Sequence, residues 1–437
     1  MVQYLDSGVC ACGKRHEVSV AELVMGKGAV SRICEMVTLL GGKKPFLLAD
    51  TNTFAVAGER VCLALRNNGF TYQKYIFPDE HLEPDERAVG AAVMHFDTSC
   101  DVIIAVGSGV VNDIGKILSN LTGNKYIIVA TAPSMDGYAS ATSSMSMDGL
   151  KVSLSSRCAD VIIGDTDILK EAPQKMLQAG LGDMLAKYVS IAEWRIAHLI
   201  TGEYYCQQVA DLIRRTLKKC VENAQGLLRR EEQAVEAVFE GLVISGIAMA
   251  YASVSRPASG VEHYFSHIWD MRGLEFGAQV ELHGIQCAMG TLQAVRLYEA
   301  LQEMTPDANK ARAYVAAFSY EDWKAQLRLL LGSGAETMIA QEAKEGKYDV
   351  STHPMRLAKI LDNWDSILQI LQQELPAYQQ LKELLDTIGI SGDLNTLGVD
   401  SKLARLSFQA TKDIRDKYVL SRLAWDLGVL DQLSSLL

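Results

Sequence analysis

The sequence predicts two domains: an α/β domain with a parallel sheet over residues 1–165, and an all-helical domain over residues 166–437. Three observations predict this. Short apolar runs alternate with amphipathic stretches in the first third of the chain, a pattern typical of right-handed β–α–β crossovers. After about residue 165, helical patterns dominate and proline is sparse. A chain of 437 residues is also too long for one ordinary core.

Five apolar runs in the first domain are predicted to be strands. In order they are Glu22–Met25, Phe46–Ala49, Tyr72–Ile76, Val102–Val106 and Tyr126–Ala130. The amphipathic stretches between them predict helices at Ala29–Leu40, Ala55–Asn67, Asp85–Phe96 and Val111–Leu121. The segment Ser140–Ser155 is predicted to form a β-hairpin that turns at Asp148-Gly149.

Composition excludes several classes of protein. The net charge of −11 argues against nucleic acid or an anionic membrane as the main partner, so a phosphate ligand needs local positive charge. The first residues lack the apolar region of a signal peptide. The apolar run Gly241–Val254 is shorter than the roughly 20 residues of a membrane span and predicts a buried helix. Nine scattered cysteines indicate reduced thiols and a cytoplasmic protein.

Three metal-donor residues lie near the N-terminus. Cys10, Cys12 and His16 occur in the sequence CACGKRH and resemble half of a zinc knuckle. Since no second Cys/His pair lies nearby in sequence, we expect a structural or incidental role.

A glycine-rich turn follows the Val102–Val106 strand directly. Glycines there let backbone amides approach a pyrophosphate, and the N-terminus of the next helix favours its negative charge. The residues predicted to bind a nucleotide cofactor at this turn are Gly107, Ser108, Gly109, Val110, Val111, Asp113 and Lys116. Asp50, after the second strand, would either accept hydrogen bonds from an adenine ribose or cap the helix that starts near Thr53, and both interpretations stay open.

The fifth strand leads into a loop rich in hydroxyl groups. It contains Thr131, Ser134, Asp136 and Ser140, and it lies at the carboxyl edge of the predicted sheet, where ligands bind. Turn formation alone would also explain its proline, aspartate and glycine. The residues alone leave both interpretations open, and it is the resemblance to a known superfamily, through the motifs given below, that implies cofactor contacts for Thr131, Ser134 and Ser140 and a substrate contact for Asp136.

Three of the eight histidines fall between residues 255 and 284. His263 and His267 are four residues apart, so on a helix they share one face, and His283 follows. Imidazole is the commonest ligand for zinc, nickel and iron(II). Asp183, in the sequence GLGDMLAK, offers an oxygen ligand; its alternative role is to balance the positive end of a helix that it opens.

These motifs resemble those of a known superfamily. The pattern G-[GS]-G-x-x-x-D-x-x-K after the fourth strand, with G-x-G-D and H-x-x-x-H further on, is similar to the superfamily of glycerol dehydrogenase, iron-dependent alcohol dehydrogenases and dehydroquinate synthase. The segment SRPASGVEHYFSH, residues 255–267, resembles the sn-glycerol-1-phosphate dehydrogenase family, and CACGKRH and TAPSMDGYAS agree with its bacterial branch. The resemblance covers roughly residues 10 to 295 and implies a Rossmann-like sheet with a helical domain, as in dehydroquinate synthase.

The resemblance also implies the chemistry. It implies that Asp183, His263 and His283 bind one divalent metal ion and that His267 stays free as a proton relay beside the substrate. Some iron enzymes of the superfamily carry a histidine where this chain has Lys187, so zinc or nickel is expected rather than iron. Lys187 and Arg256 would then contact the substrate phosphate, although Arg256 would equally serve to bridge helices.

The implied reaction is the reversible reduction of dihydroxyacetone phosphate to sn-glycerol 1-phosphate by NAD(H) or NADP(H), a step of phospholipid biosynthesis, in a homodimer. Two alternatives stay open. One is another enzyme of the superfamily, a glycerol dehydrogenase or a lyase similar to dehydroquinate synthase. The other is a non-catalytic protein that binds metal and nucleotide.

Overall fold

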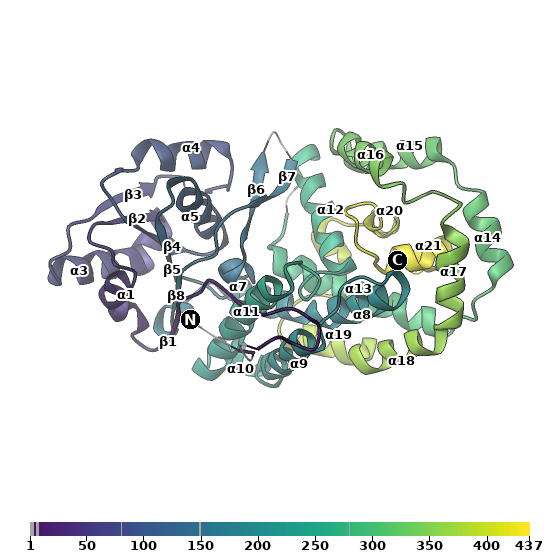
Figure 1. The fold of residues 1–437 in the computed structure, drawn as a ribbon, viewed down its shortest axis with the longest axis horizontal. Helices are drawn as coiled ribbons and strands as arrows, with labels where there is room; N and C mark the ends of the chain where they lie inside the picture. Colours follow the sequence, from purple (N-terminus) through teal and green to yellow (C-terminus); the bar gives the residue numbers. More distant parts are fainter. Residues whose placement is uncertain (1–3, 6–7, 80, 148–149, 279) are drawn as a thin grey trace. The chain divides into compact units, whose positions relative to one another are not determined.

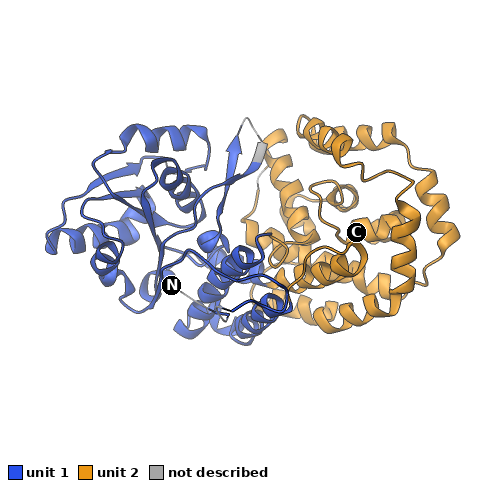
Figure 2. Cartoon of the chain, in the orientation of Figure 1, with its two compact units in different colours: residues 1–184, 207–254 blue, residues 185–206, 255–437 orange. Residues whose placement is uncertain are grey.

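The computed structural model describes residues 4–5, 8–79, 81–147, 150–278 and 280–437 (Figure 1). The chain forms two compact units (Figure 2): unit 1 contains residues 1–184 and 207–254, and unit 2 contains residues 185–206 and 255–437. Secondary structure changes from mixed to helical after residue 165, as predicted. The two compact units do not coincide with the predicted domains, because the helices of residues 166–184 and 207–254 pack with the sheet.

Unit 1 contains a six-stranded sheet in which every strand pair is parallel. The strand order is β1-β8-β5-β4-β2-β3. The strands are β1 Glu22–Gly26, β2 Pro45–Asp50, β3 Gln73–Phe77, β4 Val102–Gly107, β5 Lys125–Ala130 and β8 Val161–Asp165. All five predicted strands are confirmed. The sixth, β8, was not predicted, and it lies between β1 and β5.

Helices cover both faces of the sheet, as the crossovers require (Figure 1). On one face, Leu47 and Ile104 pack in a core with residues of α1 and α3 such as Val37 and Val61. On the other, α5 packs so closely that a Cβ on Gly115 would lie 2.7 Å from the Tyr126 hydroxyl. The helical segments up to this point are η1 Ala29–Arg32, α1 Ile33–Leu39, α2 Thr51–Thr53, η2 Phe54–Gly58, α3 Glu59–Asn67, α4 Glu86–His95 and α5 Gly109–Thr122.

The rest of unit 1 is a hairpin and a group of helices. The hairpin pairs β6 Thr142–Met147 with β7 Leu150–Ser155, as predicted, although its predicted turn at Asp148-Gly149 lies outside the described residues. The helical segments are η3 Gly137–Ala139, α6 Thr166–Leu169, α7 Gln174–Leu185, α9 Gln207–Glu222, α10 Ala224–Leu228 and α11 Glu232–Ala252. Among the described residues, α11 alone is long and apolar enough to cross a membrane, but 78% of its apolar window is buried inside the protein.

Unit 2 is helical throughout its described residues. Its long central helices α12 and α13 pack against each other, and α8 packs on both. The helical segments are α8 Lys187–Thr201, α12 Val261–Phe276, α13 His283–Gln302, α14 Ala308–Ala316, α15 Tyr320–Leu331, α16 Gly334–Glu345, α17 His353–Asp362, α18 Trp364–Glu374, α19 Tyr378–Thr387, η4 Leu394–Leu397, α20 Ser401–Thr411, α21 Leu420–Asp426 and α22 Leu430–Ser434.

Candidate functional site

The carboxyl ends of β2 and β4 lie side by side where the strand order of the sheet reverses. The chain continues from β2 to β3 on one side and from β4 to β5 on the other. Ligands of open α/β sheets bind in the crevice that such a reversal leaves. Asp50 ends β2 and Gly107 ends β4, so two residues predicted to bind the cofactor lie at this edge.

Asp50 caps the helix that follows it. The Thr53 amide donates to Asp50 Oδ1 at 2.8 Å, and the Asp50 amide donates to Thr53 Oγ1 at 3.1 Å, which together form a capping box. The capping interpretation is therefore confirmed. The ribose contact stays a prediction.

The turn after β4 leaves the N-terminus of α5 open to an anion. Ser108 is the N-cap residue, but its side chain makes no capping hydrogen bond. The first amides of a helix need partners, and a phosphate can supply them. A Cβ on Gly109 would meet only Met135, at 3.6 Å, whereas a Cβ on Gly107 would lie 2.5 Å from the Cβ of Val111. Gly107 thus permits tight packing, and Gly109 leaves the loop accessible.

Lys116 holds the neighbouring loop in place. Its side chain is buried, and Nζ lies 2.8 Å from Asp113 Oδ1 and 3.3 Å from Ser140 Oγ. These contacts tie α5 to the loop after β5. At the other end of the loop, the Thr131 amide donates to the Gly107 carbonyl oxygen at 3.1 Å. The roles predicted for these residues and for half-buried Ser134 in cofactor binding stay predictions.

The same loop brings Asp136 against α7. The Asp136 amide donates to Asp183 Oδ2 at 2.9 Å, and Ser245 Oγ donates to Asp136 Oδ2 at 2.8 Å. Close packing makes this possible, since a Cβ on Gly180 would lie 1.8 Å from the Pro133 carbonyl oxygen. The first glycine of the GLGD motif therefore lets α7 reach the loop.

One feature predicted for Asp183 is wrong. The sequence predicts this residue in the first turn of a helix, near the positive end of the dipole, but it lies in the last turn of α7. The GLG sequence does not start the helix, because it lies inside α7, where Gly180 permits close packing. The fully buried carboxylate is instead stabilised by the Asp136 amide.

The three predicted histidines come together in unit 2. His263 lies in the first turn of α12, His267 lies one turn later, and His283 is the first residue of α13. The ring centroids of His263 and His283 are 5.1 Å apart, and those of His267 and His283 are 6.1 Å apart. Cys287, one turn further along α13, places Sγ 3.5 Å from His283 Nε2. One donor atom from each of His263, His283 and Cys287 falls within 4.8 Å of the others.

Hydrogen bonds orient the two histidines that are predicted to be metal ligands. Glu262 Oε1 accepts from His263 Nδ1 at 2.8 Å, and the Ser266 hydroxyl lies 2.9 Å from His283 Nδ1. A side-chain partner at Nδ1 is the arrangement that histidines usually show when Nε2 is the ligand atom. This donor set fits a divalent transition metal such as zinc or nickel.

His267 differs from its neighbours. Burial lowers the pKa of its imidazole well below the usual range, and the positive charge of Arg415 adds to the effect. A lowered pKa favours the neutral form of the ring. A neutral imidazole donates one hydrogen bond and accepts another.

The two predicted phosphate contacts are both buried. The Arg256 guanidinium donates to both carboxylate oxygens of Glu203 at 2.5 Å, and to the Tyr418 carbonyl oxygen at 3.1 Å. Its charge is thus neutralised, which favours the bridging role. Lys187 is buried at the start of α8 and does not lie on a solvated helix face. A phosphate contact stays a prediction for both.

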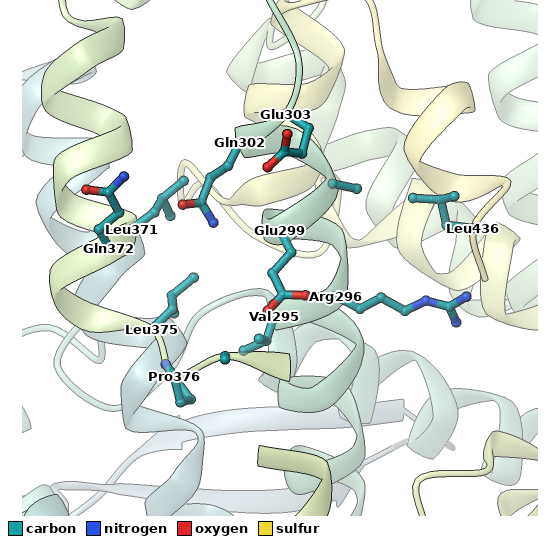
Figure 3. Close-up of a pocket in the computed structure, with 12 residues that line it drawn as sticks. Val295, Arg296, Glu299, Gln302, Glu303, Leu371, Gln372, Leu375, Pro376 and Leu436 are labelled. Carbon is teal, nitrogen blue, oxygen red and sulfur yellow. The ribbon is translucent and has the colours of Figure 1, made fainter. Parts of the chain in front are cut away.

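A hollow of about 650 Å³ in unit 2 lies apart from the histidines (Figure 3). It is lined by Val295, Arg296 and neighbouring residues of α13 and by the end of α18. Twelve residues of helix separate Val295 from His283, about 18 Å at 1.5 Å per residue. Glu299 Oε1 in this hollow accepts from the amide of Tyr378, where α19 begins, at 2.6 Å. The Glu299 carboxylate therefore accepts a hydrogen bond from the first residue of α19.

Comparison with known proteins places the fold in the superfamily that the motifs predict. Residues 24–173 match the family model of iron-containing alcohol dehydrogenases. Glycerol dehydrogenase from Schizosaccharomyces pombe superposes with a TM-score of 0.63 over 95% of this chain and 90% of that one, at 18% identity. The fold is that of glycerol and alcohol dehydrogenases.

Sequence relatives define the family within that class. Glycerol-1-phosphate dehydrogenase [NAD(P)+] from Halalkalibacterium halodurans is 33% identical over 316 residues, covering 71% of this chain and 77% of the relative. The protein of that name from Geobacillus thermodenitrificans is 32% identical over 307 residues, covering 68% and 76%. The chain belongs to the glycerol-1-phosphate dehydrogenase family.

Sequence reasoning missed four residues of this region. Cys287 follows His283 at a spacing of four, the same signal that identified His263 and His267. Glu262 directly precedes a predicted ligand, which was a weaker signal. Ser266 stands in the SRPASGVEHYFSH segment that carries the family resemblance, although no role was predicted for it. Ser245 carried no signal, because its contact with Asp136 joins segments distant in sequence.

Proposed function

We propose that this protein catalyses the reversible, NAD(P)H-dependent reduction of dihydroxyacetone phosphate to sn-glycerol 1-phosphate, with one divalent metal ion, zinc or nickel. One observation carries the proposal: the ring centroids of His263 and His283 lie 5.1 Å apart, and a donor atom of each falls within 4.8 Å of the other and of Cys287 Sγ. They do so in a chain of the glycerol-1-phosphate dehydrogenase family.

The proposed ligands are Asp183, His263 and His283. A bound divalent ion supplies Lewis acidity, which polarises a carbonyl group and stabilises an alkoxide. Glu262 and Ser266 fix the imidazole rings, so the donor atoms need little reorganisation on binding. Cys287 Sγ lies beside His283 Nε2 and is a further donor that would favour zinc over a harder ion.

The proposed cofactor site is the edge of the sheet at β2 and β4. The open N-terminus of α5 and the glycines of the turn would hold the pyrophosphate, while a nicotinamide supplies the hydride. Lys116 and Ser140 would act by fixing the loop that borders this edge. Asp50 already uses Oδ1 in its helix cap, so a ribose contact would use its other oxygen.

The proposed substrate contacts are Asp136 and His267. Ser245 orients the Asp136 carboxylate, which would accept a hydrogen bond from a substrate hydroxyl. His267 would pass a proton to or from the substrate oxygen, starting as a neutral ring with one N–H. Since Glu203 already neutralises Arg256, Lys187 is the better of the two predicted phosphate partners.

The test measures NADH and NADPH oxidation with dihydroxyacetone phosphate and with dihydroxyacetone, followed by chiral analysis of the product. We expect turnover with the phosphate and formation of the sn-1 isomer. Preference for dihydroxyacetone would indicate a glycerol dehydrogenase, and phosphate release without net NADH change would indicate a lyase. Binding of metal and nucleotide without turnover would overturn the proposal.

Metal dependence is tested on the same enzyme. Verified removal of metal should abolish activity, and zinc or nickel should restore it. Full activity without metal would contradict the assigned ligands. We also propose a homodimer in the cytoplasm, which sedimentation of the purified protein and fractionation of cells test.

A further inference from the structure

A second group of metal donors lies in unit 1, on the segment before β1. Cys10 and His16 are buried there, and Cys12 is half-buried. One donor atom from each lies within 4.8 Å of the others. These residues have no part in the reaction proposed above, and their convergence needs its own explanation.

A tight hairpin directs the two thiols. The Cys10 amide donates to the Lys14 carbonyl oxygen at 2.9 Å, and the Gly13 amide donates to the Cys10 carbonyl oxygen at 2.8 Å. Val9 and Arg15 close the hairpin as an antiparallel bridge. Gly13 has φ of +84°, a backbone conformation that favours glycine. A Cys-x-Cys-Gly turn of this kind presents two sulfur atoms to one point.

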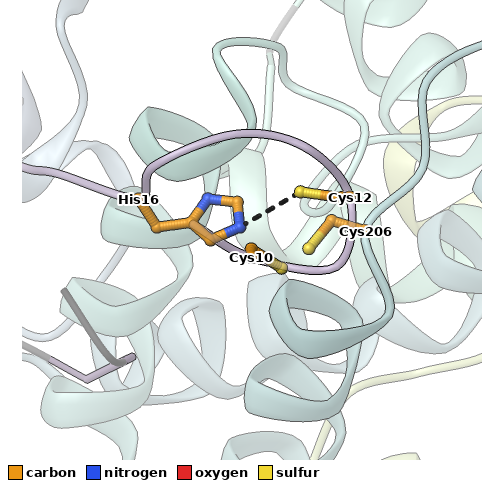
Figure 4. A group of neighbouring side chains, drawn as sticks. All are labelled: Cys10, Cys12, His16 and Cys206. Atoms are coloured by element: carbon orange, nitrogen blue, oxygen red, sulfur yellow. Dashed lines mark hydrogen bonds between the residues drawn. The ribbon is translucent and has the colours of Figure 1, made fainter. Parts of the chain in front are cut away.

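The imidazole of His16 completes the group in the orientation of a ligand. Its Nδ1 lies 3.1 Å from the Tyr251 carbonyl oxygen and therefore carries the proton. Its Nε2 faces Cys12 Sγ at 3.4 Å (Figure 4). With bonds of about 2.3 Å to sulfur and about 2.1 Å to nitrogen, a tetrahedral zinc ion separates the two donors by about 3.6 Å. A carbonyl group that fixes the opposite nitrogen is the usual support of a metal-binding histidine.

Helix register indicates where a fourth donor lies. Helices α9 and α11 pack as an antiparallel pair, in which Cys220 Sγ donates to the Ala237 carbonyl oxygen at 3.3 Å. Cys206, bonded to the first residue of α9, precedes Cys220 by fourteen residues, and Tyr251 follows Ala237 by fourteen. In an antiparallel pair of helices, two residues that lie the same number of residues from a contacting pair, one before it and one after it, stand side by side, because the rise per residue is the same in both helices. Cys206 is thus expected level with Tyr251, where His16 binds, and Figure 4 labels it with the other three.

We propose that Cys10, Cys12, His16 and Cys206 form a structural zinc site. Four protein ligands with three thiolates are typical of closed structural zinc sites, whereas catalytic sites keep a position for water. Thiolates select zinc over hard cations. The ion would fasten the N-terminal hairpin to the ends of α9 and α11, where Lys14 Nζ also donates to the Ala252 carbonyl oxygen at 3.2 Å.

The test counts metal ions in the purified full-length protein by mass spectrometry. Wild type should contain two ions per chain, and His283→Ala should keep one zinc. Cys12→Ser and Cys206→Ser should each lose that zinc. Cys220→Ser is the matched control, since this buried thiol on α9 contacts a carbonyl group and should leave both ions in place. Retention of full zinc by Cys206→Ser, or a wild type with one ion that His283→Ala removes, would overturn the proposal.

Two further measurements do not depend on the cysteine variants, which could lose zinc simply because they fail to fold. Cobalt replaces zinc and gives a thiolate charge-transfer band, which should be present in His283→Ala as well. Alkylation mapped by mass spectrometry should find Cys10, Cys12 and Cys206 protected until a chelator is added, with Cys62 unaffected by the chelator. A disulfide among the three cysteines, or alkylation independent of the chelator, would contradict the site.

Discussion

The two donor groups of this chain differ in their chemistry and in their surroundings. The N-terminal group consists of thiols and one imidazole, and Tyr251 and the hairpin backbone hold it. The group in unit 2 is dominated by imidazoles. Three thiolates favour a closed structural site, whereas histidine ligands are common in catalytic sites that keep a position open.

Their supports differ in the same way. A carboxylate and a hydroxyl orient the two proposed histidine ligands of unit 2, whereas a main-chain carbonyl orients His16. Both kinds of partner fix the tautomer and the ring orientation, but a side-chain partner can be changed by substitution, whereas a main-chain carbonyl cannot. The comparison teaches that the surroundings of a metal-donor group indicate its role better than the number of donors.

The largest effect should follow removal of a ligand in unit 2. In His283→Ala we expect kcat/KM with dihydroxyacetone phosphate to fall by about 10³-fold or more, because the Lewis acid is lost. The N-terminal zinc should remain. Steady-state kinetics and metal analysis measure this, with His95→Ala, an exposed histidine of α4, as the control. Unchanged turnover and metal content would show that the third ligand is wrongly assigned.

Gly180→Ala should have the next largest effect. The new Cβ would meet the Pro133 carbonyl oxygen, so α7 must move away from the loop that carries Asp136. We expect the melting temperature to fall by more than about 5 °C and activity to fall at least about tenfold. Gly90→Ala is the control, since a Cβ at this helical position meets nothing within 4 Å. Equal stability of the two variants would refute the packing role of Gly180.

A smaller effect concerns pH. Burial, together with the nearby Glu262 carboxylate, raises the pKa of Glu193 to about 8. The folded protein thus keeps a proton that the unfolded chain loses at about pH 4.5, so this group makes stability fall as pH rises from about 4.5 to about 8. Glu193→Gln should flatten the melting-temperature profile over this range by a few degrees. Parallel profiles of melting temperature against pH in wild type and variant would contradict the raised pKa of Glu193. The control is Glu303→Gln, which removes a carboxylate at an exposed position.

The smallest effect concerns the N-terminal hairpin. Gly13→Ala places a side chain at positive φ, which costs about 1 kcal/mol. Gly8→Ala should be neutral, because Gly8 has neither positive φ nor neighbours within 4 Å. Thermal unfolding at saturating zinc compares them. Equal stability of the two would show that the turn needs no glycine.

The sheet was predictable where strand and turn signals agreed. Val102–Val106 was identified because it is uniformly apolar and ends in glycines. β8 has the same apolar character, but its run VIIGD directly precedes the helical part of the chain and was not predicted as a strand. A strand buried on both faces shows no alternation, so only its pairing with β1 and β5 identifies it.

The site was predictable in its residue types and less so in its geometry. Helical spacing identified His263 and His267, and the chain motifs identified Asp183. The position of Asp183 within α7 was wrong, because a glycine that permits close packing has the same sequence signal as one that ends or starts a helix. Cys206 could not be predicted from the sequence as a fourth donor, since its relation to Cys10 and Cys12 depends on how α9 packs against α11.

The contact between His16 and Tyr251 spans 235 residues of sequence. At about 5–20 residues per second, a ribosome takes on the order of 10 to 50 seconds to make that stretch. During this interval the N-terminal thiols have left the ribosome while the helix end that shields them does not yet exist. The thiols of the CACGKRH segment therefore wait for the end of α11 before the contacts of the folded protein can form around them.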